Sequence, residues 1–159
     1  MMRLLEPLWA GLATAAFAAM FNLRGRDLPL AAAGGSLGWA VAAPLQAATG
    51  SQAVAYCAAS VIIGIWAELV AAIRRRPAAV YIACGILPLV PGSGMYYTML
   101  EYVRGNSWKG FATAFATLQA AGAISVGLAL SGAASRLLSL RAIARRLGRG
   151  AKDVDKAGR

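Results

Sequence analysis

Residues 28–49 read LPLAAAGGSLGWAVAAPLQAAT, and this run contains no charged side chain. A helix needs about 20 apolar residues to cross the hydrocarbon core of a bilayer, so the run is long enough to do so. A soluble protein could not keep so long an uncharged surface in water. The segment therefore predicts a transmembrane helix, and this helix indicates the fold class of the whole chain.

Four more apolar segments lie on either side of this run, over residues 7–23, 52–73, 77–100 and 110–134. Polar breaks such as Arg24-Gly25-Arg26-Asp27 and Arg74-Arg75-Arg76 separate them. Because backbone polar groups must be hydrogen-bonded inside lipid, spanning segments are helices. We predict an all-α, polytopic integral membrane protein of about five transmembrane helices, with a transmembrane domain over 1–134 and a tail over 135–159. The first segment resembles a signal peptide, but no polar mature domain follows it, so we expect a retained helix.

The composition and charge pattern agree with this class. The chain has 159 residues, of which 59% are hydrophobic and 14% charged, whereas a soluble domain has about 25% charged residues. Its net charge of +10 comes from basic residues between the apolar segments and in the tail, which is typical of membrane topology and not of nucleic-acid binding. The chain has no His, and Cys57 and Cys84 both fall inside apolar segments, so we predict no metal site, no cofactor and no enzyme activity.

The positions of the basic residues predict the orientation. Of the 16 Lys and Arg residues, Arg3, Arg104 and Lys109 fall on one predicted side and the remaining 13 on the other. Cytoplasmic loops are enriched in Lys and Arg, so we place the N-terminus outside and the C-terminus in the cytoplasm. The tail predicts either a basic amphipathic helix on anionic lipid or a solvated topology anchor. Its apolar positions are Leu137, Leu140, Ile143, Ala144 and Leu147, and its basic ones include Arg141, Arg145, Arg146 and Arg149.

The fourth segment contains a break. Residues 86–98 read ILPLVPGSGMYYT, and Pro88 and Pro91 each remove a helical hydrogen bond. Gly92 and Gly94 loosen the chain further, and Ser93 is suited to start a new helix. We predict that the fourth helix is broken at residues 88–94 and that the backbone N–H groups of about Ser93 to Tyr96 are left without helical acceptors.

Free amides at a helix start favour an anion, and broken helices form substrate sites in secondary transporters. The alternative is a proline kink that only shapes helix packing. We predict a substrate site made by Pro88, Pro91, Gly92, Ser93, Gly94, Tyr96 and Tyr97.

Two polar residues inside other apolar segments are further candidates. Glu68 could accept a proton that couples to transport or gates the path, or it could form an ion pair with Arg74, Arg75 or an arginine of the first loop. Gln119 could line a polar path or form a hydrogen bond between helices. Trp9, Trp66 and Trp108 fit interfacial anchors, whereas Trp39 is more central and its position suggests no role.

The residues at the break carry a resemblance to a known family. Pro88-Leu89-Val90-Pro91-Gly92-Ser93-Gly94 followed by Tyr96 resembles the threonine/serine exporter family, and most closely its small YjjB-like membrane subunit. The resemblance covers about residues 7–134, and further matching positions are Phe21-Asn22, Trp66 to Glu68, Pro77 and Tyr81. It implies export of threonine and serine, or of dicarboxylates such as succinate, across the bacterial inner membrane. It also implies a second membrane subunit.

The predicted helix count favours a partner independently, because secondary transporters are commonly built from two repeats. We therefore predict a subunit of an exporter for small anionic or zwitterionic solutes that works with a second membrane subunit, and a homo-oligomer is a further option. The alternative is a non-transporting membrane scaffold or anchor that acts through its basic tail. Deletion of residues 136–159 would separate the two, because only the scaffold should lose its role.

Overall fold

The computed structural model describes residues 2–137, with side chains described over 5–136. Within this part of the chain every regular element is a helix, which confirms the all-α class. The elements are α1 (Met2–Met20), α2 (Asp27–Thr49), α3 (Gln52–Arg74), α4 (Ala78–Ile86), the short 3₁₀ helix η1 (Leu87–Leu89), α5 (Gly92–Val103) and α6 (Ser107–Leu137). The predicted tail falls almost wholly on residues 138–159, which lie outside the described residues.

Three of the described helices are apolar and long enough to cross a membrane on their own. Among the described residues, α2, α3 and α6 could each cross a bilayer by length and composition, and α4 to α5 make a fourth span if the bent pair counts as one. The apolar part of α1, Leu5–Met20, is shorter. The chain is thus a multi-pass membrane protein, and the count of five spans stays a prediction.

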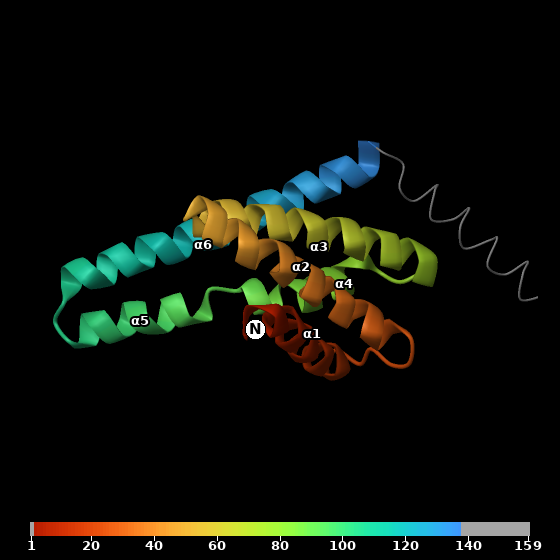
Figure 1. Ribbon diagram of the computed structural model, residues 1–159, viewed down its shortest axis with the longest axis horizontal. Coiled ribbons are helices and arrows are strands. Elements are labelled where there is room, and N and C mark those ends of the chain that lie inside the picture. The colour runs from red at the N-terminus through yellow and green to blue at the C-terminus, as the bar shows by residue number, and fades with distance from the viewer. Residues whose placement is uncertain (1, 138–159) are drawn as a thin grey trace, which may run out of the picture.

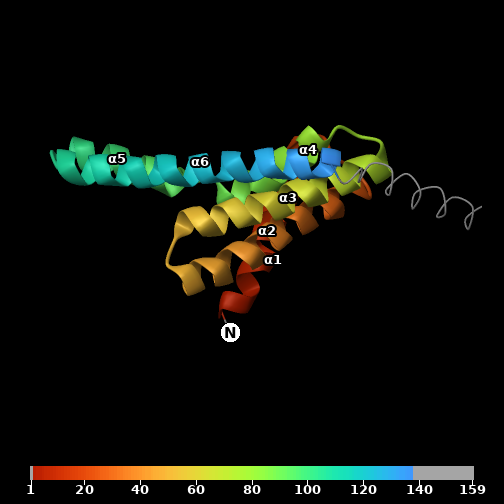
Figure 2. The same ribbon diagram turned by 90° about the horizontal axis from the view of Figure 1, so that it is seen from above.

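The helices form a bundle with one projecting arm (Figures 1 and 2). In the bundle, α2 lies between α1 and α3, and α4 packs against α2 and α3. The long helix α6 packs along α3 and then continues past the bundle, where α5 is the one described helix beside it. The α5–α6 hairpin is therefore the least covered part of the described chain, and α5 has no buried residue.

The core consists mainly of small side chains in two clusters. One cluster contains residues of α1, α2, α3 and α4, including Tyr81 and Cys84. The other contains residues of α2, α3, η1 and α6, including Ile63 and Leu89. Small residues let helix backbones approach closely, which is how helices associate in lipid without a hydrophobic driving force. Gly127 on α6 illustrates this, since a Cβ atom there would overlap the backbone carbonyl oxygen of Cys57 and the hydroxyl of Ser60 on α3.

Gly127→Ala is therefore expected to lower the free energy of unfolding by about 1–3 kcal/mol, the usual cost of overpacking, because the α3 backbone cannot rotate away. Gly122→Ala on the same helix is the matched control, since nothing lies within 4 Å of its Cβ position. It should be neutral or stabilising by up to about 1 kcal/mol, because Ala is the better helix former. Thermal unfolding in detergent measures both, and equal melting temperatures would contradict the close α3–α6 contact.

Candidate functional site

The predicted break in the fourth span is present. The chain leaves α4 at Ile86, makes one 3₁₀ turn, and starts α5 at Gly92, and the two helical parts differ in direction by 49°. Pro88 and Pro91 explain the break, because neither has an N–H to donate to the carbonyl four residues earlier. The prediction of a broken fourth helix is thus confirmed.

The hydrogen bonds at the break define which amides are free. The Val90 N–H donates to the carbonyl oxygens of Ile86 and Leu87, both at 3.2 Å, and the Gly92 N–H donates to that of Val90 at 2.7 Å. The first helical bond of α5 runs from the Met95 N–H to the Pro91 oxygen at 3.2 Å.

This leaves the amides of Ser93 and Gly94, for which no acceptor is found within the described part of the chain. The predicted set of free amides, from Ser93 to about Tyr96, is therefore too wide. The Met95 N–H belongs to that set, but it donates to the Pro91 oxygen and so is not free. Two adjacent N–H groups at the start of a 12-residue helix can still hold a carboxylate oxygen.

The N-terminal part of the break is buried in the bundle, and its C-terminal part is exposed. Leu89 is fully buried, in the cluster that contains Ile63, and so holds η1 against α2 and α3. Pro88 and Pro91 are partly buried, whereas Gly92 and Ser93 are exposed. Gly94 lies against α6, where an added Cβ would overlap the Thr117 hydroxyl. The two free amides therefore lie at the point where the chain leaves the bundle.

The other predicted site residues lie on α3, α5 and α6. Tyr96 and Tyr97 are 63% and 55% exposed, and their rings meet edge to face with centroids 5.4 Å apart. Gln119 is exposed on α6, and Glu68 is partly buried on α3, towards the end that carries Arg74.

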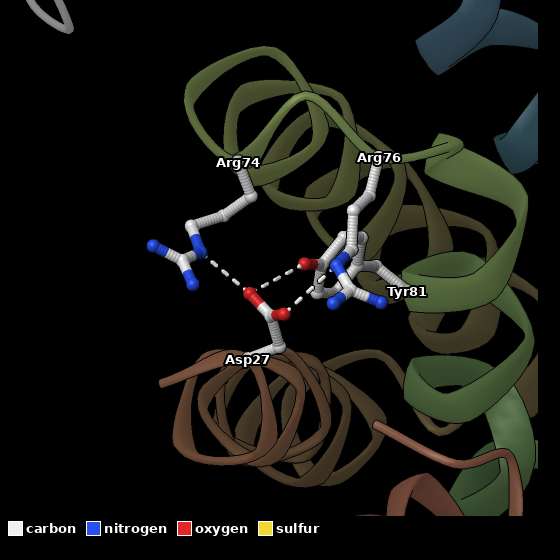
Figure 3. Close-up of polar contacts among 4 residues, drawn as sticks. All are labelled: Asp27, Arg74, Arg76 and Tyr81. Carbon is white, nitrogen blue, oxygen red and sulfur yellow. Dashed lines mark hydrogen bonds and ion pairs between the residues drawn. The ribbon is translucent and has the colours of Figure 1, made fainter. Parts of the chain in front are cut away.

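A second polar site, which sequence reasoning missed, lies where α2, α3 and α4 meet. The carboxylate of Asp27 is 1% exposed and binds three side chains (Figure 3). Arg74 Nε lies 2.5 Å from Oδ1 and Arg76 Nε lies 2.9 Å from Oδ2, and the Tyr81 hydroxyl donates to Oδ1 at 3.1 Å. We call these four residues the Asp27 clamp.

The backbone at the end of α3 makes the clamp possible. Arg75 is in the left-handed region with φ 55°, and the Arg76 N–H donates to the Ala71 oxygen at 3.1 Å, as in a common helix-ending motif. This turn lets Arg74 and Arg76 reach the same carboxylate from two sides. The available signal was that Asp27 and the arginine run fall on the same predicted side of the membrane.

The family is shown by a comparison with known protein families. A family model described as "Threonine/Serine exporter, ThrE" matches residues 6–134, a range that includes both the helix break and the Asp27 clamp. No curated protein and no solved structure matches the chain. The resemblance carried by the proline–glycine motif is thus confirmed over most of the chain. The chain belongs to the threonine/serine exporter family.

Proposed function

We propose that this chain is one subunit of a bacterial inner-membrane exporter for small carboxylate-bearing solutes, either threonine and serine or dicarboxylates such as succinate. Family membership supports a membrane transporter of the exporter type. The observation on which the substrate site rests is the pair of amides, Ser93 and Gly94, without an acceptor at the helix break. The helix dipole adds partial positive charge at this position, so a carboxylate is the favoured ligand.

A second membrane subunit would complete this site. Backbone polar groups at membrane depth are tolerated only where protein or a water-filled cavity covers them. In this chain Gly92 and Ser93 are exposed, and α5 has no buried residue. We propose that the partner packs on the projecting α5–α6 hairpin (Figure 2), where the exposed Tyr96, Tyr97 and Gln119 would face it. A second copy of this chain is the alternative occupant.

The transport step would then be a movement of the hairpin against the bundle. The Asp27 clamp ties α2, α3 and α4 together, so these helices would move as one unit. The break between η1 and α5 would act as the hinge, and rocking of one unit against another is the usual route to alternating access. Glu68 stays our candidate for coupling to a proton. We place the arginine-rich end in the cytoplasm, which puts the N-terminus outside.

Replacement of a single amide tests the substrate site. Ser93→Pro removes the N–H of residue 93, and Pro is tolerated in the first turn of a helix because that N–H has no helical acceptor. The loss of one hydrogen bond to a charged group costs about 1.5–3 kcal/mol, so transport should fall roughly ten- to a hundredfold. The measurement is uptake of labelled threonine, serine or succinate into inverted membrane vesicles from the native host strain.

Ser93→Ala is the matched control, because it removes the hydroxyl and keeps the amide. It should transport within about twofold of the unaltered protein, and both variants should reach the membrane in normal amounts. Equal transport by the Pro and Ala variants would rule out substrate binding by this amide.

A further inference from the structure

An open cavity of about 920 Å³ lies between α1 and the C-terminal half of α2. It is at the opposite end of α2 from Asp27. Glu6 of α1 borders it, together with Trp39, Ala40, Pro44 and Gln46 of α2. None of the described residues that line it is Lys or Arg, and among these residues Glu6 carries the one formal charge, which is negative.

Trp39 and Glu6 are joined across the two helices. The indole N–H of Trp39 donates to Glu6 Oε2 at 3.2 Å. This contact explains a tryptophan whose position in the sequence suggested no role. An ionised carboxylate has about four lone-pair positions, so one long bond from an indole leaves it able to accept more. The contact also fixes the carboxylate and the indole relative to each other, and both residues border the cavity.

Pro44 adds a second acceptor. It lies inside α2, where its missing N–H deprives the carbonyl oxygen of Ala40 of the usual helical donor. Ala40 and Pro44 both border the cavity. Gln46 also borders the cavity, and its side chain carries an amide oxygen. The cavity thus combines a carboxylate, a carbonyl without its helical donor and an amide oxygen, which are groups that accept hydrogen bonds.

We propose that this cavity binds a primary ammonium group. An ammonium carries one positive charge and three N–H donors, which match the charge of Glu6 and the oxygens of Ala40 and Gln46. The face of the Trp39 indole attracts the same charge. Two sources share this chemistry: the amino group of a free amino acid and the headgroup of phosphatidylethanolamine. The assignment of a free amino acid as the source of the ammonium group rests on the proposed function. The binding of an ammonium group in this cavity does not depend on that function.

Two threonine derivatives separate this cavity from the helix break. Threonine methyl ester keeps the ammonium and has no free carboxylate, and N-acetylthreonine keeps the carboxylate and has no ammonium. The full chain is placed in nanodiscs of phosphatidylglycerol, which has no ammonium group, and binding of the labelled ester is measured at equilibrium. We expect saturable binding of the ester and no competition by N-acetylthreonine. Displacement of the ester by N-acetylthreonine as readily as by unlabelled ester would overturn the proposal.

Substitutions locate the binding. Glu6→Gln keeps an oxygen that can accept from Trp39, so the helices should stay joined, and we expect at least a tenfold weaker affinity for the ester. Pro44→Ala returns a donor to the Ala40 oxygen and should weaken binding severalfold. Glu101→Gln, a carboxylate on α5, and Ser93→Pro at the break should leave ester binding unchanged. Unaltered affinity in Glu6→Gln would refute the site.

Phosphatidylethanolamine nanodiscs identify the source of the ammonium. If the lipid headgroup occupies the cavity, the apparent affinity for the ester falls in these discs, and Glu6→Gln abolishes that fall. If the solute is a free amino acid, the affinity is the same in both lipids. Because neither measurement involves transport or the helix break, failure of this site and failure of the carboxylate site are separate results.

Discussion

Export is expected to fall to background in the double variant Pro88→Ala/Pro91→Ala. Alanine at these positions restores the two N–H groups that can donate to the carbonyl oxygens of Cys84 and Leu87. Helical hydrogen bonds could then run without interruption from α4 into α5. The transport assay described above measures the effect, with the amount of protein in the membrane determined in parallel.

Export should be lost because the two free backbone N–H groups would gain helical acceptors. In a continuous helix the N–H of Ser93 would donate to the oxygen of Leu89, and that of Gly94 to the oxygen of Val90. Neither amide would remain for a carboxylate, and the hinge between η1 and α5 would disappear as well. The expected effect is therefore larger than that of Ser93→Pro, which removes one donor and keeps the bend.

Pro29→Ala is the control for this experiment. Pro29 is exposed in the first turn of α2, where an N–H has no helical acceptor in any case. Its replacement should leave both export and membrane insertion unchanged. Normal export by the double variant, at a normal amount in the membrane, would contradict both the carboxylate site and the hinge.

Asp27→Asn is expected to cause the largest loss of stability among single substitutions, about 3 kcal/mol, at the lower end of the cost of breaking a buried ion pair. The lower end applies because the Arg74 and Arg76 side chains are 33% and 51% exposed. Water can therefore partly solvate the two guanidinium groups after they lose the carboxylate. Asparagine keeps the size of the side chain but loses its charge and presents an amide N–H₂ in place of one carboxylate oxygen. Thermal unfolding in detergent reports the change.

Tyr81→Phe provides the graded comparison. It removes one hydrogen bond to Asp27 at 3.1 Å, keeps the ring in the core, and should cost about 1 kcal/mol. Export by Tyr81→Phe should remain close to normal, since the ion pairs to Asp27 persist. If Asp27→Asn unfolds at the same temperature as the unaltered protein, the clamp does not hold α2, α3 and α4 together.

The helix break could be predicted because its cause is local. Proline removes a donor from the helix wherever it lies, and Pro88 and Pro91 do so within one turn of each other. A local signal could not, however, identify which backbone N–H groups near the break are free. Whether the Met95 amide is free depends on the position of the Pro91 carbonyl, which the order of residues does not reveal.

The clamp and the ammonium cavity could not be predicted in this way. Asp27 and Arg74 are 47 positions apart, and Glu6 and Trp39 are 33 positions apart. Each residue alone is compatible with a solvated loop, a helix end or an interfacial anchor. Only the packing of α2 between α1 and α3 brings the two partners of each pair together.

Residue order was sufficient for the all-helical membrane class, the break in the fourth span and the family, because long apolar runs, missing proline donors and a short motif act within a few residues. The three-dimensional packing was needed to show that Asp27 joins three helices, that Glu6 and Trp39 share a cavity, and that Tyr96 and Tyr97 are exposed on a projecting arm. These features depend on which helix faces lie against each other. In a chain whose helices are apolar on nearly every side, local patterns do not specify those faces.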